Sequence, residues 1–169
     1  MMTLDQVHQI SEILAAVVVA VTLIFLTIQL KQNTMMLRSS ATQGAHDAMS
    51  DIYHPLMADA SLTELWLRGL QDTSQLSKVE IARFFSFWLQ PMFVLQNWYL
   101  QIQEGLLDEK VLDSFGQVVA NLHHVAPGFN EFWDQRKYVY TPEFIRFVED
   151  DLFNRDVTPG YRPLGAPEE

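Results

Sequence analysis

Apolar residues form one unbroken run near the N-terminus, and charged residues bound it on both sides. The run ILAAVVVAVTLIFLTIQL covers residues 13–30, between Glu12 and Lys31. At 1.5 Å per residue, a helix of this length measures about 27 Å, which is close to the thickness of the hydrocarbon core of a bilayer. The pattern therefore predicts a transmembrane helix over residues 13–30, preceded by a short N-terminal segment, residues 1–12.

A cleaved signal peptide is the alternative for such a run, and it needs a basic N-terminal region and a small-residue cleavage site. Residues 1–12 carry Asp5 and Glu12 but no Lys or Arg, and the following LKQNTMMLR offers no such site. An uncleaved anchor is therefore favoured. Lys31 and Arg38 follow the run, so the positive-inside rule predicts an N-terminus outside and a C-terminal body in the cytoplasm.

A second stretch without charge runs from Phe84 to Gln103, but it contains five amide side chains. Each amide facing lipid would need a hydrogen-bonding partner, which disfavours a second membrane span. Apolar residues recur here at helical spacing, at positions 81, 85, 88, 92, 95, 99, 102 and 106. This predicts a helix that is kinked at Pro91. Its apolar faces are either protein core or a surface that binds a partner. The pattern alone leaves both interpretations open.

Start signals divide the rest of the chain into helices. Two segments match the S-x-x-E capping box, Ser61 to Glu64 and Ser77 to Glu80, in which both side chains bond free N–H groups of the first turn. Three further residues are typical of helix starts: Asp108, Pro127 and Pro142. The helices expected from these signals cover residues 61–70, 77–104, 108–123, 127 onward and 141–153.

The first helix is expected to continue beyond the membrane, from about Leu4 to Tyr53, because the first proline is Pro55. Residues 31–156 are predicted to form a helical cytoplasmic domain, and the Pro/Gly-rich residues 157–169 a flexible tail. No segment has the alternating pattern of a strand. The predicted fold class is all-α, with one long N-terminal transmembrane helix that continues into a cytoplasmic bundle of about five further helices.

Composition narrows the classes of partner and chemistry. The 169 residues carry a net charge of −10 and contain no run of basic residues, so nucleic acid is not an expected partner. Cysteine is absent, which excludes disulfides, a thiol nucleophile and a zinc–thiolate site. Nearly half of the residues are apolar, which is typical of a folded body.

Three passages carry a family resemblance: LTIQLKQNTMMLRSSATQGAHD, YLQIQEGLLDEKVLDSF and FWDQRKYVYTPEFIRFVED. Together they resemble a widespread set of uncharacterised bacterial proteins. These have one N-terminal span, a Q-x-(K/R)-Q-N-T segment after it, and an aromatic, all-helical cytoplasmic body. The resemblance implies a location in the bacterial inner membrane and an all-α structure. It brings no activity, substrate or catalytic residue.

Residues suited to catalysis or metal binding are scattered. Histidines occupy positions 8, 46, 54, 123 and 124, and no two have the spacing of a helical metal pair. Neither a nucleophile elbow nor a phosphate-binding loop is present. The sequence therefore predicts no catalytic residue, metal ligand or cofactor. An enzyme would be favoured if Glu80, Asp113, His123 and His124 met in one cleft.

Two groups of residues are candidates for function. At the membrane boundary, helix packing or headgroup contact is predicted for Gln29, Lys31, Gln32, Asn33 and Arg38. On the aromatic helix, contact with a partner or ligand is predicted for Phe84, Trp88, Phe93 and Trp98. The main hypothesis is a scaffold or accessory subunit that contacts the lipid bilayer and associates with itself or another membrane protein. The alternative is an anchored sensor of a small apolar or lipid ligand.

Overall fold

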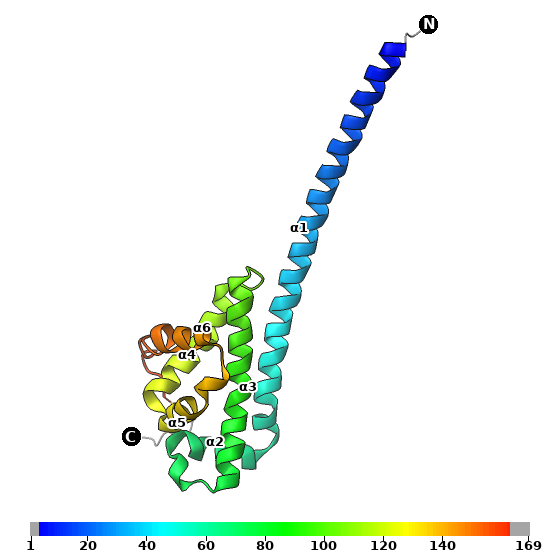
Figure 1. The fold of residues 1–169 in the computed structure, drawn as a ribbon. Coiled ribbons are helices and arrows are strands. Elements are labelled where there is room, and N and C mark those ends of the chain that lie inside the picture. The colour runs from blue at the N-terminus through cyan, green and yellow to red at the C-terminus, as the bar shows by residue number, and fades with distance from the viewer. Residues whose placement is uncertain (1–3, 163–169) are drawn as a thin grey trace. The chain divides into compact units, whose positions relative to one another are not determined.

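The computed structural model describes residues 4–162, apart from the side chain of Val7, and it confirms the all-α class. The described residues contain helices and turns and no strand. Figure 1 shows the elements in chain order, beginning with the long helix α1. The chain divides into two compact units. The first ends at Ser40 and the second begins at Ala41. Residues 1–3 of the predicted N-terminal segment and 163–169 of the predicted tail lie outside the described residues.

Helix α1, Leu4–Ala58, is longer than the sequence predicted. The expected end at Tyr53 was wrong, because the helix continues through Pro55. Proline removes one backbone hydrogen bond from a helix, but contacts beyond it stabilise the last turn. Leu56 packs against the hydrophobic core, and its carbonyl oxygen accepts a hydrogen bond from the Thr63 hydroxyl at 2.5 Å.

In the first unit, the apolar run of α1 is exposed over its whole length. It is long and apolar enough to cross a membrane, and none of the apolar window is buried by the described chain. Its hydroxyl groups bond the helix itself: Thr22 and Thr27 each donate to the carbonyl four residues earlier, at 2.8 Å. Such bonds leave no unsatisfied donor toward an apolar surrounding.

In the second unit, one face of α1 is buried in a bundle with the later helices. Ala45 and Ile52 are buried, and Ala41, Met49 and Leu56 are half-buried against the core. Steps of three, four and seven residues place these side chains on one face of a helix. Residues 41–58 of α1 therefore belong to the fold of the second unit.

Helix α2, Ala60–Gln71, begins earlier than predicted. The capping box assigned to Ser61 was wrong, because Asp59 is the N-cap. The Asp59 carboxylate accepts hydrogen bonds from the backbone N–H groups of Ser61 and Leu62, at 2.9 and 3.3 Å, and from the Ser61 hydroxyl. The Ser61 hydroxyl bond is the main cause of a lowered pKa for Asp59. A carboxylate two residues upstream thus occupies the capping position that Ser61 would have taken.

Helix α3, Lys78–Gln103, begins with the capping box that the sequence predicted. The Ser77 backbone N–H donates to Glu80 at 2.8 Å, and the Glu80 backbone N–H donates to the Ser77 hydroxyl at 3.3 Å. Glu80 also accepts from the Arg68 guanidinium of α2 at 2.5 Å. Its carboxylate therefore joins the start of α3 to α2.

The Glu80 carboxylate gives folding a dependence on acid pH. The Ser77 N–H, followed by Arg68, lowers the pKa of Glu80 from 4.5 to about 2. Because the folded pKa is below the unfolded value, this stabilisation is complete above pH 4.5 and disappears as pH falls toward 2. We expect Glu80→Gln, which keeps a cap acceptor, to unfold at a lower temperature than wild type at pH 7. The two should converge between pH 4.5 and 2 in thermal melts.

Glu64→Gln is the matched control for this experiment. Glu64 is exposed on α2, and its side chain has no hydrogen bond or ion pair among residues 4–162. Its substitution should leave the melting temperature close to wild type at each pH. Parallel curves for wild type and Glu80→Gln down to pH 2 would contradict the assignment of the pH dependence to Glu80.

The apolar face of α3 is mainly protein core. Phe84, Phe85, Trp88, Met92 and Leu95 are buried, and α1 is the only helix among the described residues that is suited to span a membrane. The outer face of α3 still exposes some apolar side chains: Val79, Phe93 and Leu100. The burial confirms the core interpretation for most of the stretch.

Two shorter elements flank the bundle helices: the 3-10 turns η1, Thr73–Gln75, and η2, Lys137–Val139. The predicted starts of three helices are confirmed: α4, Glu109–Val125, is capped by Asp108; α5, Pro127–Arg136, has Pro127 in its first turn; and α6, Pro142–Phe147, is capped by Thr141. The last helix does not run regularly to Phe153, because it widens into the π-helical turn η3, Val148–Leu152.

The π-helical turn keeps the last apolar residues on one face. Phe144, Val148 and Leu152 follow at steps of four and are all fully buried. In an α-helix a step of four advances about 40° past a full turn, and the wider π-helical turn shifts the next step back, so the three side chains share one face. Beyond it, the Thr158 backbone N–H donates to Asn121 of α4 at 2.9 Å, which holds the start of the C-terminal segment against the bundle.

Candidate functional site

The candidates at the predicted membrane boundary all lie on the exposed surface of α1. These are Gln29, Lys31, Gln32, Asn33 and Arg38. The neighbouring hydroxyl of Thr34 donates to the Leu30 carbonyl at 3.0 Å. Beyond Lys31, the apolar side chains of Met35, Met36 and Leu37 are exposed as well. This part of α1 therefore presents both amide and apolar groups.

The four aromatic candidates on α3 do not form one site. Phe84, Trp88 and Trp98 are buried in the core, whereas Phe93 is 45% exposed and its ring lies 4.9 Å from that of Tyr140. Trp88 packs among other rings, with Phe129 at 5.0 Å. Of three hollows on the second unit, one is lined by Trp98. Phe84, Trp88 and Phe93 line none of these hollows.

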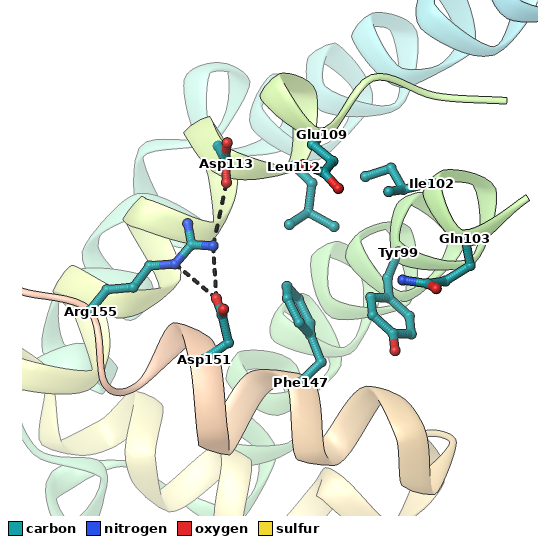
Figure 2. A pocket seen from close by; sticks show the side chains of 9 residues that line it. All are labelled: Tyr99, Ile102, Gln103, Glu109, Leu112, Asp113, Phe147, Asp151 and Arg155. Carbon is teal, nitrogen blue, oxygen red and sulfur yellow. Dashed lines mark hydrogen bonds and ion pairs between the residues drawn. The ribbon is translucent and has the colours of Figure 1, made fainter. Parts of the chain in front are cut away.

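One hollow, of about 210 Å³, has the side chain of Arg155 at its edge, and we call it the Arg155 hollow (Figure 2). The lining residues come from α3, α4, α6, η3 and the segment after η3: Tyr99, Ile102, Gln103, Glu109, Leu112, Asp113, Phe147, Asp151 and Arg155. The Tyr99 and Phe147 rings stack with centroids 4.8 Å apart and form one wall. Asp151, in the π-helical turn η3, lies beside Phe147 and faces Arg155 (Figure 2).

The cation of the Arg155 hollow is paired with two carboxylates of the same lining. The Arg155 guanidinium lies 2.8 Å from Asp151 and 3.4 Å from Asp113, and Figure 2 shows it pointing between the two carboxylates. The arrangement links η3 to α4. Because its cation is already paired, this hollow is better suited to stabilising the fold than to binding an anion.

Each residue named for an enzyme alternative contacts another residue, and Asp113 and His124 share Arg155 as partner. Glu80 bonds Arg68, and Asp113 pairs with Arg155. The His123 ring nitrogen lies 2.8 Å from the Asn130 amide oxygen, and the ring stacks on Phe153 with centroids 3.8 Å apart. His124 contacts the Arg155 carbonyl at 3.1 Å. Within residues 4–162, no group of three His, Asp or Glu side chains is placed to hold a metal ion.

A second hollow, of about 310 Å³, lies beside Trp98 and is mainly apolar. We call it the Trp98 hollow. It is lined by residues of α1, α3 and α4: Ala45, His46, Met49, Trp98, Lys110, Val111, Ser114 and Phe115. Trp98 and Phe115 meet edge to face, with centroids 6.0 Å apart. Its size and apolar lining, with a few polar groups at the rim, are typical of small-ligand sites.

Sequence patterns identified only Trp98 among the residues of this hollow. Met49 and Lys110 come from segments far apart in the chain, and no local motif connects them. Comparison with protein-family models, curated proteins and solved structures finds no match to this chain. Two features remain as indicators of function: the exposed apolar surface of α1 and the Trp98 hollow.

Proposed function

We propose that this chain is a single-pass membrane protein that acts by association, as a scaffold or accessory subunit that assembles with itself or with another membrane protein. The observation that carries the proposal is the exposed apolar surface of α1, which continues past Lys31 to Leu37. A bilayer would cover residues 13–30. Exposed apolar residues beyond that length favour contact with another protein.

The helical register of α1 supports self-association. Leu30 and Leu37 fall on one face of α1 in the first unit, about 20° apart around the axis. Both side chains are exposed. The small residues at positions 16 and 20 continue the face toward the N-terminus, and such pairs allow close packing of membrane helices.

The bacterial inner membrane is the proposed location, with the N-terminus outside and the second unit in the cytoplasm. The basic residues Lys31 and Arg38 follow the apolar run, and none precedes it. The resemblance to single-span bacterial proteins supports the same location. Gln29, Gln32 and Asn33 would then lie at the membrane boundary, where an amide can bond a neighbouring helix.

Self-association predicts a defined oligomer of the full chain in mild detergent. Leu37→Glu should shift the mass toward one chain, because it places a charge on the proposed contact face. Ser39→Glu is the matched control, since Ser39 is exposed and lies about 160° away around the helix; this variant should keep the wild-type mass. Size exclusion with light scattering measures all three. A wild-type mass of one chain would contradict self-association.

A second candidate function is the binding of a small apolar or lipid ligand by the anchored protein. The Trp98 hollow is the observation that favours it, because an apolar recess of about 310 Å³ is open at the surface of the second unit. The site differs from the aromatic set expected on α3, of which it contains Trp98 alone.

A further inference from the structure

We infer that the Trp98 hollow binds an anionic amphiphile, an apolar chain that carries one carboxylate or phosphate group. This inference rests on the second candidate function and specifies its ligand. Trp98, Phe115, Met49 and Val111 supply the apolar wall. Burying an aliphatic chain against such a wall is favourable by about 0.8 kcal/mol per CH₂ group.

The charge at the rim selects the sign of the ligand. Lys110 is the only Lys, Arg, Asp or Glu among the eight residues that line the hollow. Its side chain has no ion pair or hydrogen bond among residues 4–162. In a chain of net charge −10, an unpaired ammonium beside an apolar recess is a specific attraction for an anion.

The position of Lys110 in its helix adds to the argument. It lies in the first turn of α4, where its backbone N–H already donates to the Asp108 cap at 3.0 Å. The N-terminal end of a helix carries partial positive charge, so a lysine there is unfavourably placed. A bound anion would offset both charges. The His46 ring lies at the same rim and offers a further hydrogen-bonding group.

The Arg155 hollow shows the opposite arrangement. Its guanidinium is paired with Asp113 and Asp151, and Glu109 adds a third carboxylate to the lining. An anion would be repelled there. The Trp98 hollow differs from the Arg155 hollow because it combines an apolar wall with an unpaired cation.

The test uses the full chain in phosphatidylcholine nanodiscs, with isothermal titration and subtraction of empty nanodiscs. Octanoate should bind saturably, octanol roughly tenfold more weakly, and octyltrimethylammonium not at all. Lys110→Gln should weaken octanoate binding by about tenfold, as expected for loss of one charge-assisted contact. Lys78→Gln is the matched control: Lys78 is also exposed at a helix start and does not line the hollow, so octanoate affinity should not change.

Adding phosphatidylglycerol to the nanodiscs distinguishes the source of the anion. Competition with octanoate would identify a membrane lipid as the occupant, and unchanged affinity would identify a free amphiphile. Equal affinity for octanol and octanoate, with no effect of Lys110→Gln, would overturn the selection of an anion while leaving a ligand site. No saturable binding of any of the three compounds would overturn the ligand function itself, and this inference with it.

Discussion

Gly128→Ala should destabilise the second unit by about 3 kcal/mol, or roughly 10 °C in the unfolding midpoint. Gly128 is in the first turn of α5, where α5 crosses α2. A Cβ atom added at Gly128 would overlap the backbone carbonyl oxygen of Gly69 and lie 3.1 Å from Thr73 Cγ2. The obstacle is backbone, so no side-chain rotation relieves it, and the two helices must separate. Near-UV circular dichroism of the full chain measures the transition.

Gly44→Ala is the control that separates crowding from helix propensity. Gly44 lies within α1, and nothing approaches a Cβ atom built there within 4 Å. Alanine favours the helix over glycine by up to about 1 kcal/mol, so Gly44→Ala should be neutral or stabilising. If Gly128→Ala were also neutral, the close contact between α2 and α5 would not exist in solution.

Local sequence signals predicted most helix starts in this fold. The Ser77 box and the Asp108 cap were correct because each depends on groups within three residues along the chain. The error at Ser61 has the same local origin, since Asp59 caps the helix two residues earlier and accepts from the backbone N–H groups of Ser61 and Leu62. The extension of α1 through Pro55 had no local signal, because a contact from Thr63 stabilises it.

The sequence patterns could not predict how distant segments of the chain pack together. Gly69 and Gly128 are 59 positions apart, and no periodicity shows that their helices cross there. The Trp98 hollow likewise depends on Met49, Trp98 and Lys110 meeting from three helices. Periodicity showed that one face of α3 is buried. It did not show whether the covering surface belonged to the same chain, and the structure answers this for Phe84 and Trp88.

Trp88→Ala should cost about 3–5 kcal/mol, the range for removing a large aromatic side chain from a core. Trp88 is 4% exposed, and rings surround it: Trp66 at 6.1 Å, Phe87 at 5.7 Å, Phe129 at 5.0 Å and Phe132 at 6.4 Å between centroids. Three helices contribute these rings, so a cavity here loosens α2, α3 and α5 together. Chemical unfolding followed by near-UV circular dichroism measures the loss.

Phe93→Ala and Trp88→Phe test why this loss occurs. Phe93 is on the same helix but 45% exposed, so its truncation should cost less than about 1 kcal/mol; if its exposed face contacts a second copy, the oligomer mass falls instead. Trp88→Phe keeps an aromatic ring and removes an indole N–H that is buried without a hydrogen-bond partner among residues 4–162. Removing an unsatisfied donor is favourable by about 1–3 kcal/mol, which offsets part of the lost packing. Trp88→Phe should therefore lose less than half as much stability as Trp88→Ala. Equal losses would mean that the indole N–H is hydrogen-bonded in solution.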